Sequence, residues 1–157
     1  IDTGCRVGGL CSITVDDVDL NNQSAMVMEK GDRGRAVYFT ELAAQTLALY
    51  MSVRPASHSN ILFLGTLGKP MTVSGIGQIL RRVGERAGVT GRVNAHSFRH
   101  AFARSFLKNG GNLATLAQLL GHSPGSPVTA KYYARFDDRE LKKFHERYSP
   151  LAKLGSE

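Results

Sequence analysis

The stretch SAMVMEKGDRGRAVYF, residues 24–39, decides the fold class of this 157-residue chain. Residues 24–29 and 35–39 have the composition of β-strands, and residues 30–34 between them are rich in turn formers, so the stretch predicts a β-hairpin. Much of the remaining chain has apolar residues at helical spacing. We therefore expect a mainly α fold with a small antiparallel β-hairpin or sheet, an α+β arrangement.

The composition is that of an ordinary soluble globular domain, and the length suits one domain with one sizeable core. Lys and Arg total 20 against 13 Asp and Glu, and the net charge of +7 favours nucleic acid or an anionic membrane surface as partner. No apolar run is long enough to span a bilayer, and no signal peptide is visible. Cys5 and Cys11, predicted to share one helix over residues 5–13, form no disulfide framework, so we expect a reduced, cytoplasmic protein.

Helices are predicted along the rest of the chain. Thr40 caps a helix that ends at Pro55, and Leu42, Leu49 and Val53 share one of its faces. Thr72 or Ser74 begins another helix, whose polar face carries Arg81, Arg82 and Arg86; such a face is more often solvated than bound to phosphate. Further helices are predicted over residues 95–108, from Asn112 to Gly121, over residues 128–136 and over residues 138–148.

Polar residues able to do chemistry are concentrated at a few places in the chain. Each has a plain structural explanation when taken alone. His96 and His100 stand at i and i+4 and could hold a metal, but the HExxH pattern is missing, so a structural pair is favoured over zinc. The other candidates are Arg6 after Thr3-Gly4 at a helix start, Lys30 in the hairpin turn, Arg99, His122 after Leu120-Gly121, and Tyr132-Tyr133.

As an ordered set, these motifs resemble the tyrosine recombinase family, which includes the phage integrases and the Xer-type recombinases. The resemblance covers almost the whole chain and implies that residues 1–157 are the catalytic domain of a DNA breaking and rejoining enzyme. It also implies a fragment that lacks the N-terminal DNA-binding domain of full-length relatives. The matching text is Thr3-Gly4-Cys5-Arg6, Lys30-Gly31, HSFRHAFA at residues 96–103, LLGHS at residues 119–123 and YARF at residues 133–136.

The resemblance implies a role for each of these residues in cleaving a DNA phosphodiester. Tyr133, with Tyr132 as a rival, would attack the phosphorus and form a 3′-phosphotyrosine. A tyrosine hydroxyl is a weak nucleophile at neutral pH, so the attack needs the help of neighbouring side chains. Arg6 and Arg99 would hold the non-bridging oxygens with forked, permanently charged donors. By the same resemblance Lys30 is the general acid, His96 the general base or phosphate-orienting group, and His122 a hydrogen-bond donor to phosphate. No metal, ATP or other cofactor is implied, and Arg33, Arg81 and Arg82 are candidates for DNA contacts.

Some positions depart from the family pattern or leave alternatives open. Gly9 stands where the family usually has a carboxylate, three residues after the first arginine. The spacing from Thr129 suits both Tyr132 and Tyr133, while the following Ala-Arg-Phe favours Tyr133. A type IB topoisomerase and a non-catalytic DNA-binding module on the same fold are the alternatives to a recombinase.

Residues 137–157 are expected to form the C-terminal helix and tail. The stripe of Leu141, Phe144 and Tyr148 could pack within its own chain, whereas in the family this segment often docks into a neighbouring protomer of a ring. We therefore expect a homotetramer on double-stranded DNA, a monomer in isolation, and no membrane partner.

Overall fold

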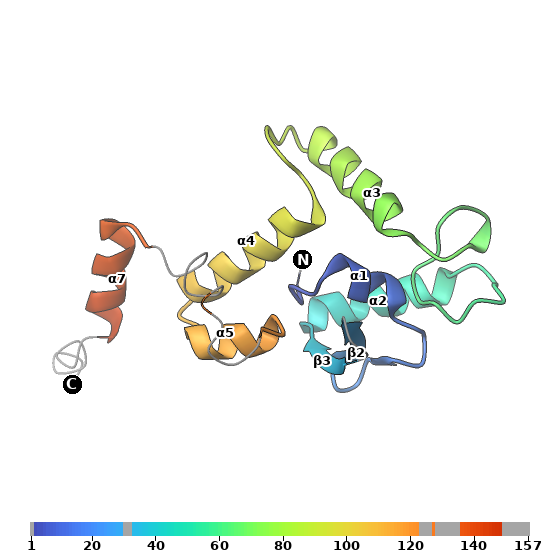
Figure 1. The fold of residues 1–157 in the computed structure, drawn as a ribbon, viewed down its shortest axis with the longest axis horizontal. Coiled ribbons are helices and arrows are strands. Elements are labelled where there is room, and N and C mark those ends of the chain that lie inside the picture. Colours follow the sequence, from blue (N-terminus) through green and yellow to red (C-terminus); the bar gives the residue numbers. More distant parts are fainter. Residues whose placement is uncertain (1, 30–32, 123–126, 128–135, 149–157) are drawn as a thin grey trace. The chain divides into compact units, whose positions relative to one another are not determined.

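The structure is a computed structural model that describes residues 2–29, 33–122, 127 and 136–148 (Figure 1). The chain divides into two compact units, Ile1–Phe102 and Ala103–Glu157. The described residues form helices and a three-stranded antiparallel sheet, which confirms the predicted fold class. None of the helices within these described ranges is long and apolar enough to cross a membrane.

The sheet belongs to the first unit and has the strand order β1 (Val18–Asp19), β2 (Ser24–Glu29), β3 (Arg33–Tyr38). Pairing runs from Ser24 opposite Tyr38 to Glu29 opposite Arg33, so the predicted hairpin is confirmed. The short strand β1 pairs antiparallel with the start of β2.

One face of the sheet carries the core of the first unit. Ala25 and Val27 are buried while Met26 and Met28 are exposed, because successive side chains of a strand point to opposite faces. Ile13, Val37 and Leu62 complete the buried cluster.

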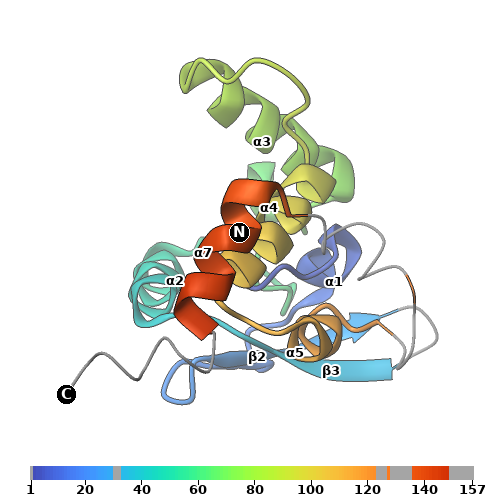
Figure 2. The ribbon, with the colours of Figure 1, turned by 90° about the vertical axis from the view of Figure 1, so that its left-hand side faces the viewer.

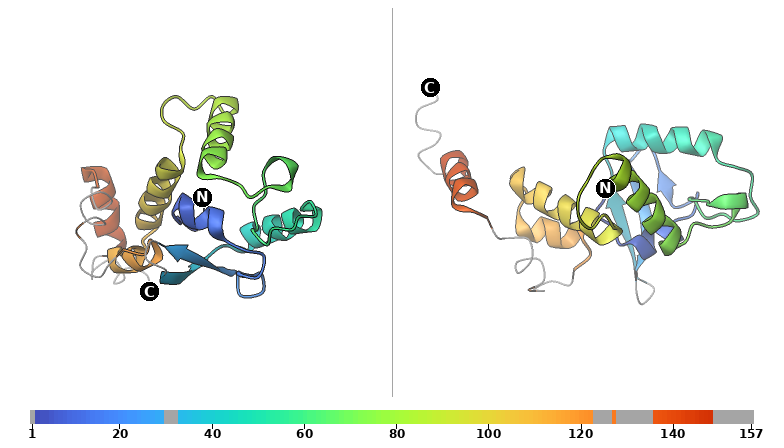
Figure 3. Two further views of the ribbon diagram at one scale, coloured as in Figure 1. Left: turned by 45° about the vertical axis from the view of Figure 1, so that its right-hand side comes forward. Right: turned by 90° about the horizontal axis from the view of Figure 1, so that it is seen from above.

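Helix α1 (Val7–Ser12) packs against β2, as the side view in Figure 2 and the turned view in Figure 3 show. Arg6 precedes it with extended backbone, φ −70° and ψ 145°, and is its N-cap residue. The helix is therefore shorter than the predicted 5–13. Cys5 lies before its first turn, so the prediction that Cys5 and Cys11 share one helix was wrong.

Helix α2 (Glu41–Val53) turns a different face to the core from the one its apolar spacing suggested. Leu42, Leu49 and Val53 are 74%, 66% and 69% exposed, whereas Ala44 is buried. Leu47, Tyr50 and Met51 pack on the core cluster.

Hydrogen bonds from one end of α2 to residues 59–64 explain this orientation. The Tyr50 hydroxyl donates to the carbonyl of Leu62 at 3.1 Å and accepts from the Leu64 amide at 3.0 Å. Arg54 donates to the carbonyls of Ser59, Ile61 and Leu62. These polar anchors turn the Tyr50 face inward and leave the Leu42 face in solvent. Thr40 is the N-cap residue as predicted, but its hydroxyl donates to Asp2 Oδ2 at 2.8 Å rather than capping the helix.

The later helices follow the predicted boundaries closely. Thr72 caps α3 (Val73–Arg86), which follows a 3₁₀ turn, η1 (Thr66–Gly68); the Thr72 side chain accepts from the Gly75 amide at 3.0 Å. Asn112 caps α5 in the same way, accepting from Thr115 at 2.7 Å. The predicted helix over 128–136 lies outside the described residues except for Phe136. The other bounds are α4 (Ala95–Lys108), α5 (Leu113–Leu119) and α7 (Asp138–Tyr148).

Candidate active site

A long-range hydrogen bond joins α4 to the segment before α1. Nη1 of Arg99 donates to the carbonyl oxygen of Gly4 at 2.7 Å. Arg99 is only 6% exposed, and a buried guanidinium needs such partners because burying an unpaired charge is very costly. The second predicted arginine is thus held in place from the backbone of the first motif.

Gly4 is required at this contact for two reasons. Its φ of +59° lies in the left-handed region, which a residue with a side chain adopts only at a cost. A Cβ added at Gly4 would also overlap the ring of Phe102, one turn further along α4 from Arg99. The Thr-Gly pair therefore allows the chain to pass close to α4 and to point its carbonyl at Arg99.

Arg6 follows two residues after Gly4 and is exposed. The Cys5 amide donates to Thr3 Oγ1 at 3.2 Å, and the Arg6 carbonyl accepts from the Leu10 amide at 3.0 Å, so both sides of this turn are hydrogen-bonded. The segment that touches Arg99 is therefore also the segment that presents Arg6. The structure brings these two predicted residues into one region of the first unit.

His96 lies one helical turn before Arg99 on α4, and the two share a face of the helix. Its ring contacts His100, with Nε2 of each ring 2.7 Å apart, ring centroids 4.3 Å apart and the planes nearly perpendicular. A nitrogen–nitrogen hydrogen bond needs one ring to donate and the other to accept. A zinc ion would need about 2.0–2.1 Å to each nitrogen, which this direct contact does not accommodate. Among the residues that the structure describes, no three His, Cys, Asp or Glu side chains gather to hold a metal.

The protonation of the histidine pair follows from its surroundings. Burial, followed by the charges of His96 and Arg99, lowers the pKa of His100 below its ordinary value of 6.5. His100 is therefore neutral at neutral pH and gives His96 an uncharged imidazole as its partner. Histidine pairs of this kind can fix which ring nitrogen carries the proton.

His122 belongs to the second unit and follows α5. Gly121 has φ +64°, its amide donates to Gln118, and the His122 amide donates to Ala117, both at 2.9 Å. These two hydrogen bonds form a Schellman motif, which explains why a glycine stands between Leu120 and His122 at the end of the helix. The backbone of His122 is thus held at the end of α5.

The remaining predicted catalytic residues, Lys30, Tyr132 and Tyr133, lie outside the described residues. Glu29 and Arg33 are paired across the hairpin, so Lys30 directly follows the last residue of β2. Arg33 is the first residue of β3.

Gly9, the departure from the family pattern, lies where α1 touches β2. A Cβ at Gly9 would stand 3.4 Å from the carbonyl oxygen of Met28 and 3.5 Å from Cβ of Val27. A longer side chain would therefore have to fit between α1 and the strand that leads to Lys30.

Arg81 and Arg82 are exposed on α3, as expected for a solvated face. Arg81 lies 3.9 Å from Glu85, and both side chains are about two-thirds exposed, so this pair contributes little to stability. Arg82 and Lys69 line an open cavity of about 500 Å³ at the start of α3.

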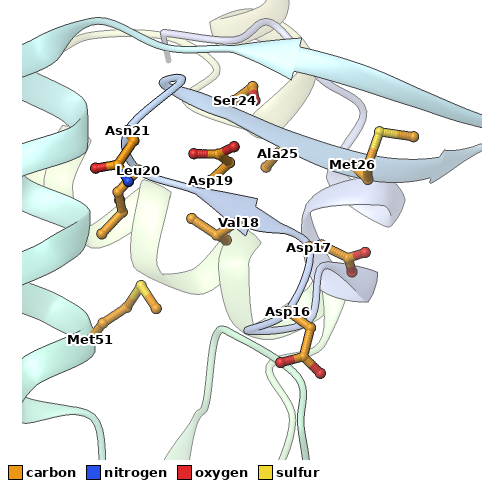
Figure 4. A pocket seen from close by; sticks show the side chains of 10 residues that line it. All are labelled: Asp16, Asp17, Val18, Asp19, Leu20, Asn21, Ser24, Ala25, Met26 and Met51. Carbon is orange, nitrogen blue, oxygen red and sulfur yellow. The ribbon is translucent and has the colours of Figure 1, made fainter.

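A cavity of about 700 Å³ near β1 is lined by Asp16, Asp17 and Asp19 (Figure 4). Figure 4 shows the three carboxylates pointing in different directions. Each accepts a hydrogen bond: Asp17 from Thr14 and Asp19 from Asn22, both within the loop, and Asp16 from the distant Asn60. This acidic turn repels phosphate and serves the fold of the loop.

The sequence did not predict the Gly4 carbonyl as a partner of Arg99, because a backbone acceptor leaves no pattern of its own. The structural pair of His96 and His100 was predicted, and the contact between their rings agrees with it.

Known proteins resemble this chain in sequence. The profile of the phage integrase family matches residues 1–139. Tyrosine recombinase XerC of Pediococcus pentosaceus is 32% identical over 156 residues, which cover 94% of this chain and 51% of that protein. XerC of Bacillus subtilis is 32% identical over 157 residues, covering 96% and 51%. The chain spans about half the length of the curated relatives it matches.

Solved structures also share the fold. The crystal structure of XerA recombinase superposes with a TM-score of 0.83 at 33% identity, covering 95% of this chain and 55% of that one. XerH recombinase bound to its difH substrate gives 0.73 at 24% identity, covering 94% and 44%. The integrase of transposon Tn1549, in complex with a circular intermediate DNA, gives 0.73 at 24% identity, covering 93% and 55%. At 24% identity, the similarity to the XerH and Tn1549 structures shows that the fold is shared.

Proposed function

Because this chain belongs to the phage integrase family of tyrosine recombinases, we propose that residues 1–157 are the catalytic part of a site-specific recombinase. It acts in the cytoplasm on double-stranded DNA, which it cleaves and rejoins through a covalent 3′-phosphotyrosine. The observation that carries the proposal is the hydrogen bond from Arg99 to Gly4, because it joins the two arginine motifs in one region.

Arg6 and Arg99 stabilise the charge that develops on the attacked phosphate. Two guanidinium groups match the two non-bridging oxygens, and their charge is independent of pH. Arg99 is held in advance by Gly4, so little reorganisation is needed when the transition state forms. The two arginines thereby take the part that metal ions play in other phosphoryl-transfer enzymes.

During cleavage one side chain of the protein accepts a proton and another donates one, so the net proton count is unchanged. The oxygen of the Tyr133 hydroxyl bonds to phosphorus and its proton passes to His96, while the bond from phosphorus to the 5′ oxygen breaks and Lys30 protonates that oxygen. The phosphodiester energy is kept in the phosphotyrosine, so rejoining is the reverse reaction and uses no ATP. His122 donates a hydrogen bond to a phosphate oxygen.

Positive charge brings the DNA to this site. The chain carries a net charge of +7, and Arg33, Arg81 and Arg82 add contacts to the backbone of the duplex. XerH and the Tn1549 integrase, which share the fold, were solved in complex with DNA. On DNA the protein forms a homotetramer in which residues 137–157 are exchanged between protomers, and alone it is a monomer.

The experiment that tests this function uses a DNA duplex nicked near the cleavage site, which traps the covalent adduct. The protein should form an adduct that survives denaturation, that Tyr133→Phe abolishes and that Tyr132→Phe retains. An adduct lost only in Tyr132→Phe would move the nucleophile to Tyr132. No adduct from a folded, DNA-binding protein would leave a non-catalytic module in place of the enzyme.

A further inference from the structure

His96 and His100 form a hydrogen-bonded pair of rings on α4. Their Nε2 atoms are 2.7 Å apart, and the ring planes stand at 85° to each other. A contact through ring carbons would need about 3.5 Å or more, so this separation identifies both contacting atoms as nitrogens. His96 is exposed, whereas His100 is half-buried. The pair therefore joins an accessible ring to one that the protein partly encloses.

The helical segment that carries the pair is held on either side of His96. At the start of α4, the Ser97 amide donates to Asn94 Oδ1 at 2.9 Å, which caps the first turn. Further along the helix, Arg99 donates to the Gly4 carbonyl at 2.7 Å. A backbone fixed in this way leaves the rotation of the His96 side chain, and the contact with His100 restricts that rotation.

The pairing determines which nitrogen of His96 can serve as a base. A neutral imidazole has one N–H donor and one acceptor nitrogen. Nε2 of His96 is engaged with His100, so Nδ1 is the nitrogen left to accept the proton of the attacking hydroxyl. Nδ1 can accept only while the ring proton is on Nε2, and Nε2 then donates to His100. The acceptor is therefore Nε2 of His100, whose own proton is on Nδ1.

The surroundings of His100 suit an acceptor. Burial, followed by the charges of His96 and Arg99, lowers its pKa below the ordinary value of 6.5, so its ring stays neutral and keeps a lone pair. When His96 takes up a proton, its Nε2–H continues to donate to His100. The opposite arrangement would then set two N–H groups against each other. A buried aspartate holds the histidine of a Ser-His-Asp triad by the same logic.

We propose that His100 is a positioning residue for the cleavage reaction: it accepts a hydrogen bond from Nε2 of His96 and thereby holds that ring with Nδ1 ready to take a proton. The inference rests on the proposed function, in which His96 accepts the proton of the nucleophile. His100 acts through His96 and has no contact with the reacting atoms in this role.

The first test measures the tautomers of the parent chain without DNA. Two-bond ¹H–¹⁵N correlation spectra of the histidine rings, recorded at mildly alkaline pH, identify the protonated nitrogen. His96 should carry its proton on Nε2 and His100 on Nδ1. His100→Phe keeps a ring of similar size but lacks the acceptor, so His96 should become a mixture of both tautomers. A proton on Nδ1 of His96 in the parent, or an unchanged single tautomer in His100→Phe, would overturn the proposal.

The second test measures single-turnover adduct formation on the nicked duplex at saturating DNA, together with Kd and the unfolding midpoint. His100→Phe should slow adduct formation by about tenfold with Kd unchanged within about twofold, because one hydrogen bond to the base is lost. His100→Gln should recover most of the rate, since its side-chain oxygen can accept from His96. Equal slowing in both variants, or a loss confined to Kd or to the unfolding midpoint, would contradict the positioning role.

His58→Phe is the matched control, because it makes the same substitution at an exposed histidine outside the helices and strands. It should match the parent chain in rate and in the tautomer of His96. A parent chain that forms no adduct overturns the proposed function and, with it, the catalytic purpose of the pair. An active parent with the other tautomer of His96, or with a parent-like rate in His100→Phe, overturns the positioning role alone.

Discussion

Arg99 and Gly4 stand 95 residues apart in sequence and are joined by a 2.7 Å hydrogen bond from guanidinium to carbonyl. The contact ties the helix that carries His96 to the turn that carries Arg6. A phosphate bound by both arginines would meet groups already held in position, which is how preorganised sites lower a barrier.

Gly4→Ala should destabilise the protein by about 2–4 kcal/mol, the sum expected for a left-handed backbone with a side chain and for a clash in a packed site. Urea unfolding measures the change, and adduct formation should fall with it. Gly8→Ala is the control, because Gly8 lies in α1 with nothing within 4 Å of an added Cβ. That variant should be stabilised by about 0.5–1 kcal/mol. Equal effects at the two glycines would argue against the tight turn.

Arg6→Ala should reduce the single-turnover cleavage rate by about 10²-fold or more while weakening DNA binding far less, because its charge acts on the transition state. Arg6 is exposed, and the urea unfolding midpoint of Arg6→Ala checks that the variant keeps the fold. Arg99→Lys should behave similarly, since a lysine cannot supply the forked donors. Rates come from the nicked duplex and affinities from fluorescence anisotropy. Parallel losses in rate and affinity would mean that these arginines only hold DNA.

Acidification should destabilise the fold through His100. Its pKa is below the ordinary 6.5 because of burial, then the charges of His96 and Arg99. The folded state consequently binds fewer protons than the unfolded state below that pH. The contribution of His100 to the free energy of unfolding is therefore fully present above its ordinary pKa of 6.5 and is lost as the pH falls from there through the lower pKa of the folded state. Urea unfolding at several pH values, with His100→Gln beside the parent, measures it; an equally steep acid slope in His100→Gln would contradict the assignment.

Removing divalent metal should leave cleavage unchanged. The reason is that the proposed charge stabilisation comes from the guanidinium groups of Arg6 and Arg99. Adduct formation is compared before and after dialysis against EDTA, with added magnesium as the reverse arm. Strong inhibition by EDTA that magnesium restores would replace the arginine mechanism with a metal-dependent one.

Local features of this protein were readable from its sequence. The hairpin over β2 and β3, the caps at Thr72 and Asn112 and the glycine ending of α5 depend on residues close together in the chain. Turn and capping chemistry acts over that short range, so it leaves a direct pattern. The order of the polar motifs likewise indicated the family, since it needs no coordinates.

The tertiary structure decided what depends on partners far along the chain. Periodicity allowed α2 to bury the Leu42 face, but the bonds of Tyr50 and Arg54 to residues 59–64 turned the opposite face inward. The Gly4 carbonyl accepts from Arg99 only because packing brings two distant segments together. In the same way, Glu140 of α7 forms an ion pair with Lys108 of α4. Hydrophobic spacing specifies that a face is buried, whereas the geometry of long-range hydrogen bonds and ion pairs specifies against what.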